Sequence, residues 1–168
     1  MRRQTFFNEA WTGLAVFDET GRYRYWLSRC WNSSRPPLNF IMLNPSTADA
    51  EHLDPTVTRC LRYAQKWGFG SLIVTNIFAW RSTKPDTLPT INDPVGSENN
   101  AYLVWAAAIS ALRVAAWGAH PSSIIRGPAV RTLLSRFPLS ILGTTQNGSP
   151  RHPLYCPSSL MPQSYQPA

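Results

Sequence analysis

The chain is poor in charge and poor in cysteine, and each shortage excludes a class of protein. Of its 168 residues, 15% are charged and 43% are hydrophobic, which argues against intrinsic disorder and suffices for one domain with a sizeable core. The three cysteines, Cys30, Cys60 and Cys156, are odd in number and far apart. This pattern suits neither a disulfide framework nor a metal site, so we expect a reducing compartment and no metal.

Long apolar runs are also missing. No uninterrupted apolar stretch is long enough to span a bilayer. The residues that follow Arg2 and Arg3 lack the apolar region of a signal peptide. The sequence therefore predicts a cytoplasmic protein without a membrane partner, and it does not indicate an oligomeric state.

The charge that is present is mostly arginine. The formal net charge is +7 and the sequence pI is near 9.8, from 16 basic and 9 acidic residues. Two of the 16 basic residues are lysines, Lys66 and Lys84, and the other 14 are arginines. Because the planar guanidinium suits phosphate, this bias favours a nucleic acid or nucleotide partner over a basic surface that only maintains solubility.

Periodicity and turn residues predict one α/β domain over residues 1–155, with a mostly parallel central sheet, helices on both faces and an N-terminal β-hairpin. Residues 156–168 are predicted to be an extended or disordered tail. The predicted strands are the hairpin strands Leu14–Phe17 and Tyr23–Leu27, followed by Leu38–Leu43, Ser71–Thr75, Leu112–Trp117 and Leu139–Gly143. The predicted helices run from Pro55 to Gly68 or Gly70, from Val95 to Ser110, and, with Ser122 or Ser123 as the cap, to about Arg136.

The second hairpin strand alternates aromatic residues with arginine. Tyr23, Tyr25 and Trp26 stand beside Arg22 and Arg24. This arrangement is typical of a half-exposed strand.

The most informative feature is the abrupt end of the strand Leu38–Leu43 at Asn44-Pro45. Pro45 disfavours helical geometry at Asn44 and removes a backbone donor, so the strand must stop there. In an α/β protein the carboxyl ends of strands bind ligands. The polar residues placed there are Asn44, Ser46, Thr47 and Asp49.

Polar residues also stand at the ends of other predicted strands. They are Thr75-Asn76, Gly118-Ala119-His120 and, beyond a short loop, Arg151-His152-Pro153-Leu154. In a parallel sheet these segments emerge at one edge, which predicts a pocket with two amides, one or two histidines, a carboxylate and arginines. The long connection 79–94 is expected to be functional, and Phe78 or Trp80 is placed to stack on a base.

Five motifs together resemble a known family. They are Leu43–Asp49, Asp54-Pro55-Thr56, Val74-Thr75-Asn76, Trp117–His120 and Arg151–Tyr155. Between Leu14 and Tyr155 the chain resembles an uncharacterised family of bacterial and phage proteins, whose distribution implies a role in phage defence or in the modification of phage DNA. The order of the motifs also resembles the uracil-DNA glycosylase superfamily, especially its mismatch-specific branch.

The second resemblance implies a three-layer, uracil-DNA glycosylase-like fold and a monofunctional DNA glycosylase without a cofactor. Such an enzyme extrudes a pyrimidine from double-stranded DNA, or takes it from a single strand, and leaves an abasic site. By this resemblance Asn44 positions the attacking water, and Asn76 reads the Watson–Crick edge of the base. Asp49 or Asp54 would assist, although the motif match assigns neither of them a role.

The resemblance also implies roles for the last motif. His152 would hydrogen-bond a base carbonyl, Leu154 would fill the gap in the base stack, and Arg151 would hold phosphate. His120 is an alternative catalytic histidine. Further contacts are expected to the base from Pro45, Ser46, Phe78 and His120, and to the DNA from Thr47 and Arg81.

Each residue also has an ordinary structural interpretation. Asn44 and Asn76 would be turn residues, Asp54 a helix cap and His152 a surface histidine. The glycosylases strict for uracil place a tyrosine shortly after the first-motif proline, whereas here Ser46, Thr47 and Ala48 follow. These small residues predict a pocket for a pyrimidine with a substituent at C5, such as a modified base in phage DNA.

Two other functions fit the same pocket. One is a nucleotide- or nucleoside-processing enzyme, and the other is a non-catalytic DNA-binding module with a base pocket. No P-loop or Gly-x-Gly-x-x-Gly sequence is present, which argues against the common phosphate-binding loops.

Overall fold

The structure, a computed structural model, describes residues 1–166. Strands come first and helices alternate with strands later. The elements are β1 (Arg2–Phe7), β2 (Thr12–Phe17), β3 (Arg24–Cys30), β4 (Pro37–Met42), α1 (Pro55–Lys66), β5 (Ser71–Asn76), the 3-10 helix η1 (Pro85–Thr90), α2 (Asn99–Ile109), β6 (Leu112–Ala115), α3 (Pro121–Leu133), β7 (Ser140–Ile141), the 3-10 helix η2 (Pro153–Tyr155) and β8 (Gln163–Ser164).

All the strands belong to one mixed sheet of order β1-β2-β3-β5-β4-β6-β7-β8. The strands β5, β4, β6 and β7 pair in parallel. Within residues 1–166 the other four of the seven pairings are antiparallel, so the prediction of a mostly parallel sheet is wrong. The predicted hairpin is the cause, because β3 pairs with β5 and brings β1 and β2 into the same sheet. Local periodicity predicts strands but not which edges they join.

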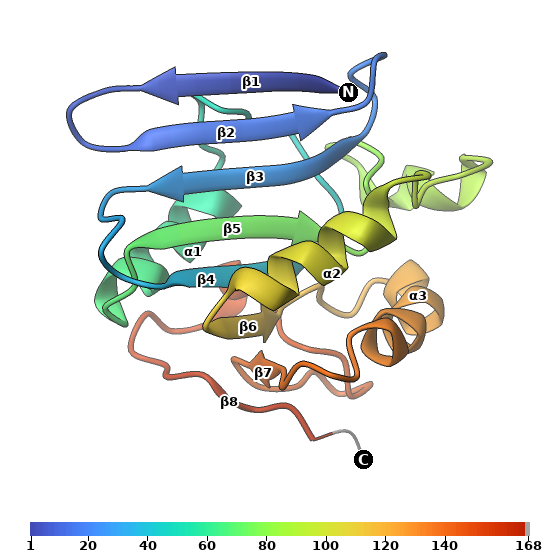
Figure 1. Ribbon diagram of the computed structural model, residues 1–168. Helices are drawn as coiled ribbons and strands as arrows, with labels where there is room; N and C mark the ends of the chain where they lie inside the picture. Colours follow the sequence, from blue (N-terminus) through green and yellow to red (C-terminus); the bar gives the residue numbers. More distant parts are fainter. Residues whose placement is uncertain (167–168) are drawn as a thin grey trace.

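Helices cover both faces of this sheet, as predicted (Figure 1). Alternate residues of β4 and of the turn after it pack on opposite faces of the sheet. Phe40 and Met42 pack with residues of α1, whereas Ile41 and Leu43 pack with residues of α2 and α3. The strand is therefore buried on both sides, which explains why it is apolar apart from the buried Asn39.

The prediction of a half-exposed strand at β3 is wrong. Arg24 and Arg29 are only 2% and 1% exposed. The loop after β4 crosses this part of the sheet, and both guanidinium groups donate to its carbonyl oxygens. These hydrogen bonds offset the cost of burying the two charges.

Two helices begin at other residues than the sequence suggests. Gly96 has a φ of +83°, outside the helical range, so α2 starts at Asn99 and not at Val95. The third helix spans Pro121–Leu133, because His120 serves as its N-cap in place of the predicted Ser122 or Ser123. The predicted start of α1 is confirmed, with Asp54 as N-cap and Pro55 in its first turn.

Side-chain donors on α1 hold the described part of the C-terminal segment. Tyr63 Oη donates to the carbonyl oxygen of Pro157 at 2.7 Å, and Lys66 Nζ donates to that of Ser158 at 3.0 Å. Further along, Gln163–Ser164 pairs with β7. Residues 156–166 thus run along the domain, with one turn closed by a hydrogen bond from Leu160 N–H to the carbonyl oxygen of Pro157, and residues 167–168 lie outside the described part of the chain.

No helix in residues 1–166 has the length and apolar character needed to cross a membrane.

Candidate functional site

A cleft of about 540 Å³ opens at the carboxyl ends of β4, β5 and β6. Its central strand is β4, which has β5 on one side and β6 on the other, so the connections from the strands diverge there. This is the place where open parallel sheets bind ligands. Gly118, at a φ of +77°, turns the chain from β6 into α3 and completes the edge of the cleft.

The cleft is lined by both apolar and polar residues. The apolar residues include Met42, Leu43, Val57, Val74 and Trp117. The polar and charged side chains are Arg24, Asn44, Ser46, Asp54, Thr56, Asn76, Ser82, Thr83, His120, Thr145, Arg151, His152 and Tyr155. An apolar cavity with a few convergent polar groups is the usual form of a small-molecule site.

Asn44 is held in one orientation at the end of β4. Its Nδ2 donates to the carbonyl oxygens of Pro45 at 3.0 Å and Ser82 at 2.8 Å. Because both partners are acceptors, the amide nitrogen must face them. The Oδ1 atom is then left to accept a hydrogen bond from a water or a ligand.

Asn76 lies at the end of β5, beside a buried cation. Its Oδ1 accepts from Arg24 Nη2 at 3.3 Å, and Arg24 Nη1 donates to the carbonyl oxygen of Ala48 at 2.7 Å. Burial lowers the pKa of Arg24 to about 10, and the charge of Asp54 partly opposes this shift. Within residues 1–166 no carboxylate lies within ion-pair distance of this guanidinium.

His152 approaches from the segment after β7. Its Nδ1 accepts from the backbone N–H of Leu154 at 3.3 Å. In a neutral ring the proton then sits on Nε2, which becomes a hydrogen-bond donor. Burial lowers the pKa of His152 from its ordinary value of 6.5, although the charge of Asp54 partly opposes this. His152 is therefore a neutral donor at neutral pH.

His120 also lines the cleft, but the protein occupies both of its ring nitrogens. Nδ1 accepts from the backbone N–H of Ser122 at 3.2 Å, and Nε2 lies 3.0 Å from Asp86 Oδ1. These contacts cap α3 and tie it to η1. The geometry therefore gives His120 a structural role and leaves His152 with the free ring nitrogen.

Of the two carboxylates considered, the cleft contains Asp54 and not Asp49. Asp54 Oδ1 caps α1 by accepting from Val57 N at 2.7 Å, which leaves its second oxygen available. Asp49 lies in the loop after the motif and lines a neighbouring hollow. Burial raises the pKa of Asp49, but hydrogen bonds from the backbone of His52 and Glu51 outweigh this effect and lower it.

The other predicted residues divide into two groups. Ser46, Arg151 and Leu154 line the cleft, and Leu154 is 42% exposed at its rim. The lining does not include Pro45, Phe78, Thr47 or Arg81. Pro45 and Phe78 are buried, and Thr47 is exposed. Arg81 donates to the carbonyl oxygen of Gly21 at 3.0 Å and lies over the ring of Phe17.

Sequence patterns do not reveal Arg24 as a residue of the cleft, and they also miss Ser82, Thr83 and Thr145. An arginine between aromatic residues resembles the outward face of a strand. No signal at this position marks the burial, because Arg22, Arg24 and Ser28 would share one face of an alternating strand and that face looks polar.

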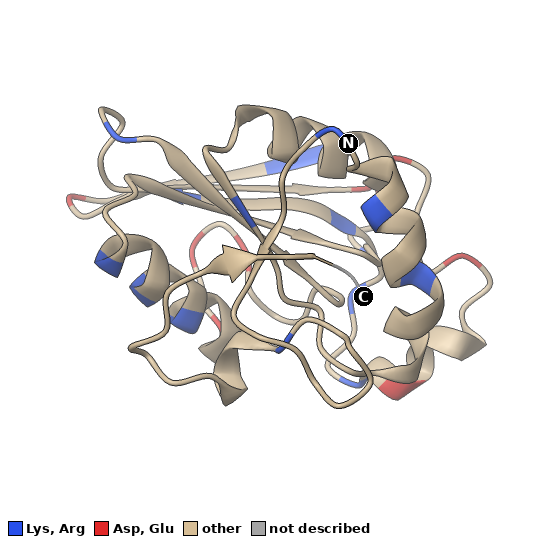
Figure 2. Cartoon of the chain, turned by 90° about the horizontal axis from the view of Figure 1, so that it is seen from below, with Lys and Arg blue, Asp and Glu red and all other residues tan. Residues whose placement is uncertain are grey.

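Charge is distributed unevenly over the fold. All nine acidic residues lie outside the α-helices and strands, so these elements carry positive charge alone (Figure 2). Much of the arginine is used internally, since several guanidinium groups donate to backbone carbonyl oxygens. These are Arg24, Arg29, Arg59, Arg81, Arg113, Arg126 and Arg151. The net charge from composition therefore overstates how many arginine side chains are free to contact a partner.

The chain matches the family described as "Protein of unknown function (DUF1643)" over residues 24–154. The chain belongs to this family. The match covers β3 to η2 and so includes all the polar cleft residues except Tyr155. It confirms the resemblance to an uncharacterised family, whereas the similarity to the uracil-DNA glycosylase superfamily stays a prediction. No curated protein and no solved structure matches the chain.

Proposed function

We propose that this protein is a DNA N-glycosylase that hydrolyses the bond between an extruded pyrimidine and its deoxyribose. The observation that carries the proposal is the convergence of Asn44, Asn76 and His152, from three separate segments, in one cleft. Its volume of about 540 Å³ lies within the range of small-molecule sites. We also propose that the parallel strands and their helices form a uracil-DNA glycosylase-like core.

In this mechanism Asn44 Oδ1 orients a water toward the sugar C1′. An amide cannot take the proton, so Asp54 receives it as the carboxylate of the cleft. The water oxygen bonds to C1′ while the C1′–N bond breaks, and the bonding electron pair leaves with the base. The proton on Asp54 later returns to the departed base or to solvent.

His152 stabilises the departing base. The negative charge develops on the base carbonyl oxygens, and the neutral ring offers its Nε2 proton to one of them. A donor that is already oriented needs no rearrangement during the reaction. Asn76 holds the same base at its Watson–Crick edge.

The rim of the cleft suits extrusion of a base. Leu154 and Tyr155 are 42% and 76% exposed and follow His152-Pro153. An apolar side chain at this place can enter the base stack and fill the gap that the base leaves. The small side chain of Ser46 on the lining favours a base with a substituent at C5.

Formation of abasic sites tests the proposal. Oligonucleotides with uracil, mismatched thymine, 5-modified uracil or 5-modified cytosine are incubated with the protein and then cleaved with alkali. We expect cleavage at one or more of the 5-substituted bases, and its loss in Asn44→Ala and His152→Ala, with the circular dichroism spectrum unchanged. Cleavage at no base, or unchanged cleavage in both variants, would contradict the proposal.

A second candidate is an enzyme that processes a free nucleotide. The buried Arg24 guanidinium, without an ion-pair partner among the described residues, favours an anionic ligand in the cleft. Binding to duplex DNA separates the two functions. The glycosylase binds duplex with an affinity that falls as salt rises, whereas the nucleotide enzyme prefers the free ligand.

A further inference from the structure

Arg24 and Asn76 together fix what the cleft can offer to a base. An arginine can only donate hydrogen bonds, so the atom of Asn76 that faces it must be the amide oxygen. Within residues 1–166 no hydrogen bond is found for Asn76 Nδ2, and Asn76 lines the cleft. The amide therefore presents its N–H groups to a ligand and cannot turn over without breaking the contact to Arg24.

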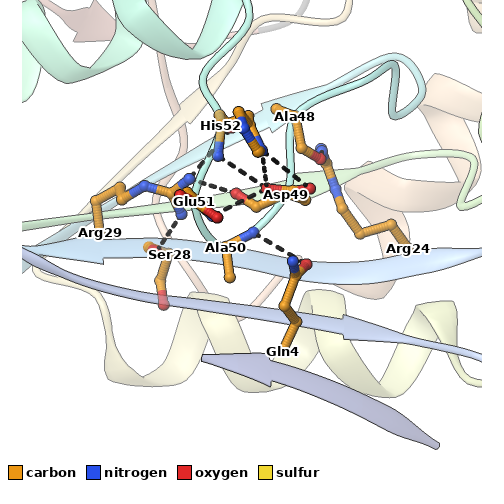
Figure 3. A network of polar contacts seen from close by, with 9 residues as sticks. All are labelled: Gln4, Arg24, Ser28, Arg29, Ala48, Asp49, Ala50, Glu51 and His52. Atoms are coloured by element: carbon orange, nitrogen blue, oxygen red, sulfur yellow. Dashed lines mark hydrogen bonds and ion pairs between the residues drawn. The ribbon is translucent and has the colours of Figure 1, made fainter. Parts of the chain in front are cut away.

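Arg24 is itself held in place. Its side chain is 2% exposed, and Nη1 donates to the carbonyl oxygen of Ala48 at 2.7 Å. Figure 3 shows the segment Ala48–His52 between Arg24 on one side and Arg29 on the other. Because the guanidinium plane is fixed by the loop, it fixes the orientation of the Asn76 amide in turn.

His152 is a second donor held in one orientation in the cleft, whereas the fixed Oδ1 of Asn44 is engaged by the water in the proposed mechanism. His152 Nδ1 accepts from Leu154 N–H, so Nε2 carries the proton of the neutral ring. Asn76 and His152 come from different segments, at the end of β5 and at the start of η2. A base between them is best satisfied when its edge has an acceptor for each.

The two classes of pyrimidine differ at this edge. Both classes have a carbonyl oxygen at C2. Uracil and thymine then present an N–H at N3 and a carbonyl oxygen at C4, whereas cytosine presents an unprotonated N3 and an amino group at C4. A free asparagine amide can rotate to accept from that amino group. An amide held by Arg24 faces the amino group with N–H, which leaves both donors unsatisfied. Toward a 4-oxo base the same N–H donates to the C4 oxygen, and the second lone pair of Asn76 Oδ1 accepts from N3–H.

We propose that Arg24 is a positioning residue that makes the cleft selective for 4-oxopyrimidines over 4-aminopyrimidines. This inference rests on the proposed glycosylase function and narrows its substrate to uracil- or thymine-type bases, including those with a substituent at C5. Arg24 acts through Asn76 and not by contact with the reacting atoms.

Two pairs of substrates with the same 5-methyl group test this role. The first pair is single-stranded DNA with thymine or with 5-methylcytosine, which avoids differences in base pairing, and the readout is kcat/KM for abasic-site formation. The second pair is the nucleosides thymidine and 5-methyl-2′-deoxycytidine, whose binding is followed by NMR of ¹⁵N-labelled asparagine side chains. We expect the protein to prefer the 4-oxo member of each pair by about tenfold or more.

Arg24→Met should reduce this preference to about twofold or less, because the Asn76 amide becomes free to rotate. Arg24→Lys, which keeps a donor, should retain part of it and serves if Arg24→Met fails to fold. Arg29→Met is the matched control. Arg29 is equally buried and holds the same loop through the carbonyl oxygens of Asp49 and His52, but it makes no hydrogen bond to Asn76.

The outcomes separate this inference from the function on which it rests. A preference in nucleoside binding without abasic sites in DNA would refute the glycosylase and support the role of Arg24. Abasic sites formed equally from both bases would support the glycosylase and overturn the role of Arg24. The role of Arg24 is also overturned if neither nucleoside binds and neither base is excised. It is overturned as well if Arg24→Met keeps the preference for the 4-oxo base, or if Arg29→Met loses this preference to the same extent as Arg24→Met.

Discussion

The side-chain amide of Asn44 donates to the carbonyl oxygen of Ser82 at 2.8 Å, and this contact ties the end of β4 to the connection after β5. The same Nδ2 atom donates to Pro45 O at 3.0 Å. The residue is thus both a loop anchor and, through Oδ1, the group that we propose orients water. These two tasks can be separated by mutation.

Asn44→Asp is expected to destabilise the protein more than Asn44→Ala. A carboxylate would face two carbonyl oxygens with no proton to donate, and each such conflict in a part-buried place costs about 1–3 kcal/mol. Asn44→Ala should lose excision by about a hundredfold or more, because the attacking water is no longer held in position. Urea denaturation gives the order of stability. The reverse order would show that Nδ2 does not face these carbonyls.

The lowered pKa of His152 predicts a loss of stability on acidification. In the unfolded chain the histidine binds a proton near pH 6.5, whereas in the folded protein burial delays protonation to lower pH. The free energy of unfolding should therefore fall as the pH drops below about 6.5, and this contribution should level off below the folded-state pKa.

His152→Gln should remove that part of the pH dependence, because glutamine does not titrate. The matched control is His52→Gln, since the side chain of His52 is 72% exposed and lies outside the cleft. Thermal unfolding between pH 5 and pH 8 compares the variants. Equal acid sensitivity in His152→Gln and in the unaltered protein would contradict the burial argument.

Leu154→Ala should impair excision from duplex DNA more than from single-stranded DNA. Only the duplex requires a wedge in the base stack, and we expect a selective loss of about tenfold or more. Stability should change little, since Leu154 is 42% exposed. Ile125→Ala, at an 83% exposed residue of α3 that does not line the cleft, is the control and should alter neither rate. An equal loss on both substrates would exclude the wedge.

Tyr63→Phe should weaken the attachment of the C-terminal segment to α1. The Tyr63 hydroxyl donates to Pro157 O at 2.7 Å, and its loss should cost about 0.5–1.5 kcal/mol in the free energy of unfolding. Tyr155→Phe is the control, because Tyr155 is 76% exposed. Chemical denaturation with both variants measures the difference. Equal stabilities would show that the segment adds nothing through this contact.

The parts of the fold that local chemistry determines could be predicted from the sequence. The apolar run of β4 and the stop at Pro45 identify a strand buried on both faces. Asp54-Pro55 identifies the start of α1. The strand ends that carry Asn44, Asn76 and His120 are predicted by the same change from apolar to polar or turn-forming residues. The structure places all three residues in one cleft.

The remaining features depend on contacts between distant segments. The edge at which β3 joins β5 is not encoded in either strand, which is why the prediction of a mostly parallel sheet is wrong. The burial of Arg24 requires the loop carbonyl of Ala48, which lies 24 residues further along the chain. The choice between His120 and His152 likewise depends on partners such as Asp86, which motif spacing does not supply.

The most direct test of the proposed glycosylase is single-turnover formation of abasic sites, with 5-substituted uracil in single-stranded DNA as substrate. The unaltered protein should convert this DNA to alkali-sensitive product. His152→Gln should do so about a hundredfold more slowly at neutral pH, with the DNA still bound. Absence of abasic sites with the unaltered protein, under conditions where it binds the DNA, would contradict the proposed function.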